Sequence, residues 1–180
     1  MEISIKTIGS IMGLVLMAIL VNAITTLKFG SLKEIAIEKP KSYVSSENVD
    51  RTLDCLAMNI YKEAGRESFE GKVAVAQVTL NRVDNPKFPK DICNVVHQKN
   101  VIMEKVVCQF SWYCDGHEKA KPNNNDYKES YQVAKKVLLE GFRIDGLKDA
   151  LYYHAVYINP AWPHIQVAKI GNHIFYKERK

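Results

Sequence analysis

Apolar side chains recur every three or four residues in the central part of the chain, which is the pattern of an amphipathic helix. The positions that share this spacing are Leu53, Leu56, Ala57, Ile60 and Ala64. They predict a helix over residues 49–64 that ends at Gly65. Ser68 is a suitable N-cap for a second, largely apolar helix that runs to about Val83.

The next part of the chain is interrupted by prolines and is expected to be mostly irregular. Two short helices are predicted there, one over residues 91–98 and one just before Lys105. A third long helix is expected over residues 126–140, with Gly141 as its cap.

The end of the chain is rich in β-branched and aromatic residues, which favour strands. Strands are expected within residues 150–158, 165–170 and 173–176, and the two-residue turn Gly171-Asn172 joins the last two. Helices followed by a small antiparallel sheet predict an α+β fold.

The start of the chain carries 21 residues without a charge, from Thr7 to Leu27. About 20 apolar residues span a bilayer as a helix. A cleaved signal peptide is the alternative, because Lys6 precedes the segment and Val21-Asn22-Ala23 resembles a cleavage site. We favour a membrane anchor in residues 1–28, a linker in 29–48 and one domain in 49–180, held outside the cytoplasm in the periplasm or cell wall.

The formal net charge is +5, which suits an anionic polymer but excludes little by itself. We find no basic helix interleaved with aromatic residues and no nucleic-acid motif, so nucleic acid is not an expected partner.

Four cysteines in an exported domain allow up to two disulfides with three possible pairings. Cys55 is interpreted as a buried thiol on the first helix, and one bridge is expected among Cys93, Cys108 and Cys114. The alternative is a zinc site, although its cysteine spacing is wider than is typical of structural zinc. Its ligands would be His97, Cys108, Cys114 and His117.

Glu63 lies on the apolar face of the first helix, three residues after Ile60. Burial raises the pKa of a carboxyl group towards the range in which it donates a proton near neutral pH. Glu63 is therefore a candidate general acid. The alternative is a structural carboxylate that pairs with Lys62 or Arg66.

The segment around Glu63 resembles the SleB/CwlJ-type cell wall hydrolases, whose signature is Tyr-x-Glu-Ala-Arg-Gly-Glu followed by a Val-Ala-x-Val-x-x-Asn-Arg-Val helix. The resemblance covers about residues 52–176. One departure matters, because the chain reads Gly65-Arg66 where the family usually has Arg before Gly. The matching residues of the signature are Tyr61, Glu63, Ala64, Glu67, Gly71, Val73, Ala74, Val75, Ala76, Val78, Asn81, Arg82 and Val83. Further matches are Phe88-Pro89, Cys93 to Val96, Gln109 to Trp112, Cys114 to Gly116, Tyr153 to Ala155, Asn159 to Trp162, and Ile170 to Tyr176.

This resemblance implies a lysozyme-like catalytic domain with Glu63 at the base of a cleft. It implies a peptidoglycan-cleaving enzyme, a lytic transglycosylase or other glycosidase that cuts the MurNAc–GlcNAc bond. Such an enzyme needs no metal or other cofactor, and we expect it to be a monomer bound to glycan strands and to the membrane. Roles in spore germination, wall remodelling and phage lysis all remain open.

Two carboxylates are the rule in glycosidases, and candidates for a second are Glu67, Glu70 and Asp115. A lytic transglycosylase works with one, because a hydroxyl of the sugar itself attacks. The residues expected to bind substrate are Gln109, Ser111, Trp112, Tyr153 and His154.

Trp112 has core packing as its alternative role. Since Tyr153 and His154 are neighbours on a strand, one should point inward and the other outward. Two other functions are alternatives: a cysteine peptidase that uses Cys55 or Cys108 with His154, and a wall-binding module without activity.

Overall fold

Three long helices carry the core: α2 (Val49–Ala64), α3 (Phe69–Asp84) and α5 (Asn125–Leu139). All three confirm the predicted helices to within two residues. The Ser68 hydroxyl caps α3 as expected, because its Oγ accepts a hydrogen bond from the Gly71 amide at 3.3 Å. Gly141 follows α5 with a φ of +76°, a backbone conformation that glycine adopts without strain.

The computed structural model describes residues 35–37, 48–116 and 121–179. The predicted anchor lies outside these residues, as does most of the predicted linker. Within the described part of the chain, no helix is both long and apolar enough to cross a membrane.

Helix α3 is buried along most of its length, because α2, α4 (Ile92–Val96) and α5 pack around it. This explains why the apolar residues of α3 are not confined to one face of the helix. Strand β4 (Phe142–Ile144) lies along α3, where the Gln77 side chain bonds both the amide and the carbonyl of Ile144 at 2.7 and 3.1 Å. The short helix η3 (Asp145–Leu147) follows β4.

Strand β1 (Ile35–Ile37) pairs antiparallel with β4, so three residues of the predicted linker join the fold. Nothing in the local sequence indicates this strand, since its partner lies about one hundred residues further along the chain.

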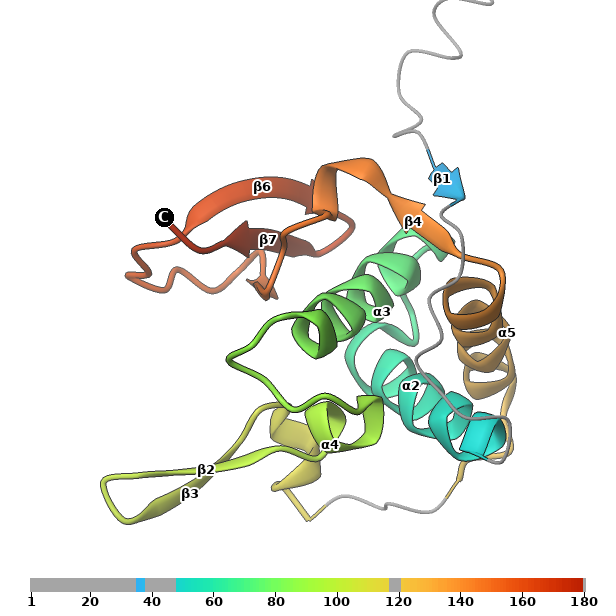
Figure 1. The fold of residues 1–180 in the computed structure, drawn as a ribbon, viewed down its shortest axis with the longest axis horizontal. Coiled ribbons are helices and arrows are strands. Elements are labelled where there is room, and N and C mark those ends of the chain that lie inside the picture. The colour runs from blue at the N-terminus through green and yellow to red at the C-terminus, as the bar shows by residue number, and fades with distance from the viewer. Residues whose placement is uncertain (1–34, 38–47, 117–120, 180) are drawn as a thin grey trace, which may run out of the picture. The chain divides into compact units, whose positions relative to one another are not determined.

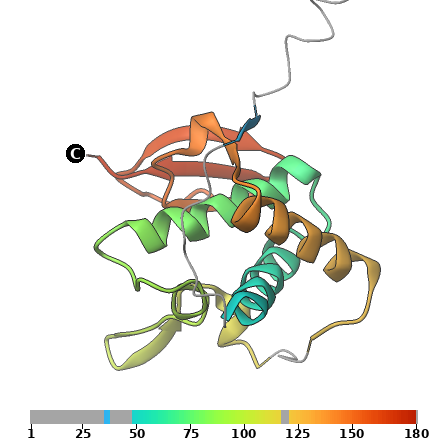
Figure 2. The same ribbon diagram turned by 45° about the vertical axis from the view of Figure 1, so that its right-hand side comes forward.

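The predicted helix before Lys105 is wrong. The chain there forms an antiparallel hairpin of β2 (Lys99–Ile102) and β3 (Lys105–Cys108), which projects from the body in Figures 1 and 2. Its β-branched residues favour strands. Met103 and Glu104 both take positive φ, as a two-residue hairpin turn requires, but the usual Asn-Gly signal is absent.

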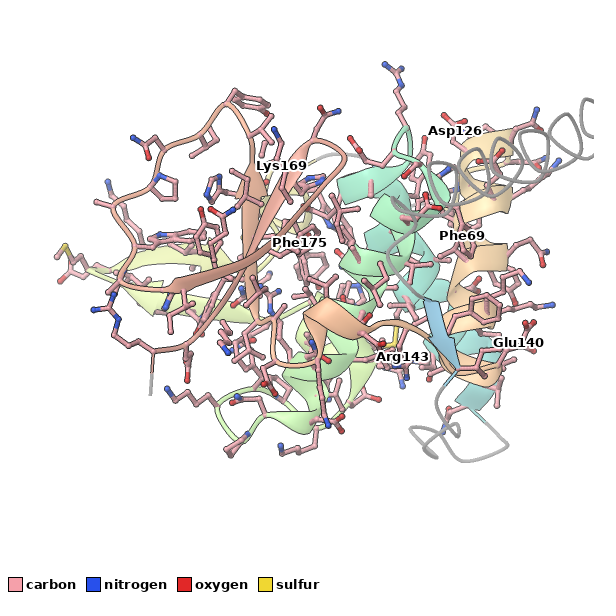
Figure 3. The ribbon with its side chains drawn as sticks, turned by 90° about the horizontal axis from the view of Figure 1, so that it is seen from above. Phe69, Asp126, Glu140, Arg143, Lys169 and Phe175 are labelled. Atoms are coloured by element: carbon pink, nitrogen blue, oxygen red, sulfur yellow. A yellow bond between two sulfur atoms is a disulfide. The ribbon has the colours of Figure 1, made fainter. Side chains whose placement is uncertain are left out.

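The C-terminal sheet contains β5 (Tyr152–Ala155), β6 (Ile165–Ile170) and β7 (His173–Lys177) in the order β5-β7-β6. The predicted hairpin through Gly171-Asn172 is confirmed, whereas the first strand is shorter than expected. Figure 3, seen from above, shows Phe175 of β7 between the sheet and the helices, where it is fully buried. This side chain joins the sheet to the core.

Both pairs of cysteines form disulfides. The bridge expected within the trio is Cys108–Cys114, which closes the base of the β2–β3 hairpin over helix η2 (Ser111–Tyr113). The interpretation of Cys55 as a free buried thiol is wrong, because Cys55 on α2 bonds Cys93 on α4. Helix packing brings these two residues together, and their sequence separation of 38 gives no local signal.

Candidate active site

A pocket of about 240 Å³ lies where α2, α3, the β3–η2 segment and β5 meet. Glu63 near the end of α2 is its only carboxylate among the described residues. A larger pocket of about 620 Å³ lies near the C-terminal segment and includes Glu178. The other carboxylates of the larger pocket, Asp84 and Asp149, are exposed, and Glu178 is already bonded to Lys87 and Tyr152. The smaller pocket holds a carboxyl group whose pKa is raised by burial, so it is the better catalytic candidate. The residues lining the smaller pocket are Glu63, Arg82, Gln109, Phe110, Ser111, Tyr152, Tyr153 and Trp162.

Burial raises the pKa of Glu63 above its usual value, as the helix pattern predicted. Two weaker effects oppose this shift. The Tyr153 hydroxyl donates a hydrogen bond of 3.0 Å to Glu63 Oε2, and the positive charge of Arg82 attracts the carboxylate. The net result is a carboxyl group that holds its proton at higher pH than an exposed one. Its ionised form is stabilised by the Tyr153 hydroxyl and by the charge of Arg82.

Arg82 is a functional candidate whose role the sequence did not reveal. Its guanidinium is buried between the rings of Phe110 and Phe88, whose centroids lie 5.0 and 5.5 Å from Cζ. Nε donates to the Leu151 carbonyl at 2.9 Å, which fixes the plane of the group. Burial lowers the pKa of Arg82, but a guanidinium stays charged in proteins. In the sequence Arg82 is marked only by its place in the signature of the resembled family, because α3 carries Lys72 and several other polar residues as well.

Three of the residues expected to bind substrate, Gln109, Ser111 and Tyr153, line this pocket. Tyr153 and His154, which are neighbours on β5, point to opposite sides of the strand, as predicted. His154 is not among the residues that line the pocket. Its Nε2 lies 2.8 Å from the Tyr176 hydroxyl, and its ring contacts Trp162.

Trp112 lies in the core rather than in the pocket, so its predicted stacking role is wrong. It is 7% exposed, and its Nε1 donates to Asn59 Oδ1 at 3.1 Å. Asn59 in turn donates to Thr79 Oγ1 at 3.2 Å. A buried indole N–H needs such a partner, and a helix-to-helix network supplies it.

Trp112→Phe should therefore lower the free energy of unfolding by about 1–3 kcal/mol, because it leaves Asn59 without a donor and opens a small cavity. Urea denaturation followed by circular dichroism measures this loss. Trp162→Phe is the matched control and should stay within about 0.5 kcal/mol of the parent. Equal losses in the two variants would contradict the assignment of Trp112 to the core.

The three candidates for a second carboxylate lie away from the pocket lining. Glu67 accepts hydrogen bonds from the amide and Nδ2 of Asn172, at 3.1 and 2.9 Å, and so holds the turn between β6 and β7. Glu70 lies in the first turn of α3, where a negative charge is favourable. Asp115 is exposed. The chemistry that fits this pocket uses a single carboxylate.

The disulfides argue against both alternatives that need free cysteines, the cysteine peptidase and the zinc site. Cys55 and Cys108, the proposed peptidase nucleophiles, are both in disulfides. The zinc alternative loses the thiolates of Cys108 and Cys114 for the same reason. His117, its fourth ligand, lies outside the described residues.

The fold and the site define the class of this protein as an α+β domain with one partly buried carboxyl group in a pocket. A family model described as Cell Wall Hydrolase matches residues 66–176, and the chain belongs to this family. The match begins three residues after Glu63, so the role of Glu63 rests on the geometry of the pocket rather than on the family model.

Similar proteins agree with this membership. The spore cortex-lytic enzyme of Bacillus subtilis (strain 168) is 31% identical over 128 residues, which cover 67% of this chain and 35% of that protein. The enzyme of the same name from Bacillus cereus is 32% identical over 133 residues, covering 69% and 44%. The chain thus spans less than half the length of these relatives.

Two solved structures have the same fold. The catalytic domain of the Bacillus cereus SleB protein is 27% identical, with a TM-score of 0.55, and the similarity covers 78% of this chain and all of that one. The catalytic domain of SleB from Bacillus anthracis, described as a germination-specific lytic transglycosylase, is 28% identical with a TM-score of 0.54, over 74% of this chain and all of that one. These similarities confirm the predicted lysozyme-like α+β fold.

Proposed function

We propose that this chain cleaves the glycan strands of peptidoglycan at the MurNAc–GlcNAc bond by lytic transglycosylation. The observation that carries the proposal is Glu63, a carboxyl group with a raised pKa and no second carboxylate beside it among the described residues that line the pocket. The Bacillus anthracis domain, whose description names this reaction, supports the choice over simple hydrolysis.

In the proposed reaction, protonated Glu63 donates its proton to the glycosidic oxygen as the bond from C1 of MurNAc breaks. The resulting carboxylate is stabilised by the Tyr153 hydroxyl and by the charge of Arg82. It then accepts the proton of the C6 hydroxyl while the C6 oxygen bonds to C1. The 1,6-anhydro ring closes, Glu63 is protonated again, and no water is consumed. One carboxyl group alternates as acid and base.

Gln109 and Ser111 are proposed to bind hydroxyl or N-acetyl groups of the sugars, since both side chains donate and accept hydrogen bonds. The domain is proposed to act outside the cytoplasm, and its two disulfides support an oxidising compartment. Attachment to the membrane through residues 7–27 and a monomeric state are further parts of this proposal.

The test is mass spectrometry of the soluble products released from purified peptidoglycan by the full chain. We expect muropeptides that end in 1,6-anhydro-MurNAc, and none from the Glu63→Gln variant. Reducing-end MurNAc from the parent would instead indicate a hydrolase. Cleaved stem peptides, or no product at all, would reject a glycan-cleaving enzyme.

Tyr153→Phe should move the alkaline limb of the pH–rate profile to higher pH. The Tyr153 hydrogen bond stabilises ionised Glu63 and lowers its pKa, so its loss raises that pKa further. Activity falls as pH rises through the pKa of the acid, and a higher pKa therefore delays the fall. We also expect about a tenfold lower kcat, because the carboxylate loses a positioning hydrogen bond. Phe keeps the ring, so an unshifted profile would show that Tyr153 is only a packing residue.

A further inference from the structure

Trp162 is an exposed tryptophan in the wall of the catalytic pocket. It lies in the loop between β5 and β6, is 41% exposed, and lines the same pocket as Glu63. The other tryptophan, Trp112, is buried and has a hydrogen-bond partner. A large aromatic side chain left open beside a reactive carboxyl group is typical of a surface that binds a ligand.

The neighbours of Trp162 hold its ring in place without stacking on it. Its four aromatic contacts are all edge-on, with interplanar angles between 61° and 81°. These neighbours are themselves fixed in two stacked pairs. The rings of one pair lie 4.2 Å apart, and the other pair shares a hydrogen bond of 2.8 Å. A side chain that is already fixed loses little conformational entropy on binding. The two stacked pairs are Tyr152 with His164 and His154 with Tyr176.

The lining of the pocket combines an exposed aromatic side chain with polar side chains. Trp162 belongs to the part of the chain that builds the C-terminal sheet, whereas Gln109 and Ser111 adjoin the base of the β2–β3 hairpin. Figures 1 and 2 show the sheet above α3 and the hairpin below it. A pyranose ring has the matching surfaces, because its C–H face is apolar and its edges carry hydroxyl and acetamido groups.

We propose that Trp162 is the stacking platform of a sugar subsite beside Glu63, and that an N-acetylated pyranose of the glycan is held between this ring and the side chains of Gln109 and Ser111. The subsite takes a carbohydrate rather than a peptide, since a flat ring in the same pocket as amide and hydroxyl groups fits a sugar. This inference rests on the proposed function and names the group that the pocket contacts.

The test uses the full chain in mild detergent, with Glu63→Gln to prevent turnover. A soluble tetrasaccharide of alternating GlcNAc and MurNAc is titrated while tryptophan fluorescence is recorded, and equilibrium dialysis gives the dissociation constants. In this background Trp162→Ala should bind about tenfold more weakly, and Trp162→Phe about threefold. The fluorescence change should vanish in both, because the buried Trp112 does not contact the sugar.

Kinetics on the otherwise unchanged chain give a second readout. We expect Trp162→Ala to raise KM about tenfold and to leave kcat within about twofold, because a stacking contact acts equally on the bound ground state and on the transition state. Tyr157→Ala is the matched control, since Tyr157 is in the same loop and 83% exposed but is absent from the pocket lining. It should change neither constant.

The outcomes separate the subsite from the proposed reaction. If Trp162→Ala and Trp162→Phe both bind the tetrasaccharide like the parent, the platform is rejected, even while anhydro products that depend on Glu63 still support the reaction. If binding depends on Trp162 but no anhydro product forms, the platform holds and the proposed reaction fails. Circular dichroism checks that the variants fold. If the Ala variant unfolds, the binding of the tetrasaccharide by Trp162→Phe tests the platform instead.

Discussion

Replacement of Glu63 by Gln should lower the rate of peptidoglycan cleavage by about 10³-fold or more, because general acid–base catalysis contributes about 10²–10⁴-fold. Gln has nearly the shape of Glu and can still accept the hydrogen bond from Tyr153, so the pocket should keep its form. What the variant lacks is the proton for the glycosidic oxygen. The release of soluble muropeptides over time measures the loss.

Glu70→Gln is the matched control for this experiment. It makes the same chemical change in the first turn of α3, away from the pocket lining, and should leave the rate within about twofold. A Glu63→Gln variant that retains a tenth or more of the parent activity would remove Glu63 from the mechanism.

The same Glu63→Gln substitution should make the domain more stable at neutral pH. Burial raises the pKa of Glu63 in the folded state, so the folded state holds the proton more strongly than the unfolded state does. Below the unfolded pKa, near 4.5, both states are protonated and the two proteins should unfold alike. As pH rises above this value the unfolded state of the parent ionises first and gains stability, which the Gln variant avoids. Melting temperatures at pH 4 and pH 7 test this sign.

Removal of the Cys55–Cys93 disulfide by a double substitution to Ala should give the largest loss of stability, about 3–4 kcal/mol. The bridge closes a sequence separation of 38, and the loop entropy lost from the unfolded chain grows with that length. For a domain of this size the melting temperature should fall by roughly 10 °C. Scanning calorimetry of the two proteins at the same pH measures the difference.

The Cys108–Cys114 bridge provides the comparison, with a separation of 6 and an expected loss of about 2 kcal/mol. Its removal should lower the rate of peptidoglycan cleavage even while the domain stays folded, because Gln109 and Ser111 lie between the two cysteines. The variant without Cys55–Cys93 should instead keep its activity while it stays folded. An equal effect of both removals on activity would contradict a specific role of the short loop in shaping the pocket.

Local patterns in the sequence predicted the elements whose causes are local. The apolar spacing along α2 and the caps of α3 and α5 act within a few residues, so these helices were found nearly to the residue. The tight turn at Gly171-Asn172 acts over an even shorter range. The hairpin of β2 and β3 was missed, because Met103 and Glu104 adopt the turn without the glycine or asparagine that normally marks it.

The site was predicted in part for the same reason. Glu63 was found because its helix face indicated burial, and burial does raise its pKa. The choice between the two tryptophans depended on packing. Trp112 and Trp162 look alike in the sequence, but only Trp112 meets the amide of Asn59 in the core. Arg82 lies in the same pocket as Glu63 because α3 packs against α2, and the sequence does not indicate this packing.

The sequence by itself determined the three long helices, the terminal hairpin, the α+β class and the acidic residue at the centre of the site, since each depends on neighbours along the chain. Only the tertiary structure decided the partner of Cys55, the pairing of β1 with β4, the exclusion of Glu67 from the pocket lining, and the placement of Trp112 in the core and of Trp162 in the pocket lining. The physical reason is that these features depend on contacts between residues far apart in sequence, and no local pattern encodes which distant side chain occupies a given place.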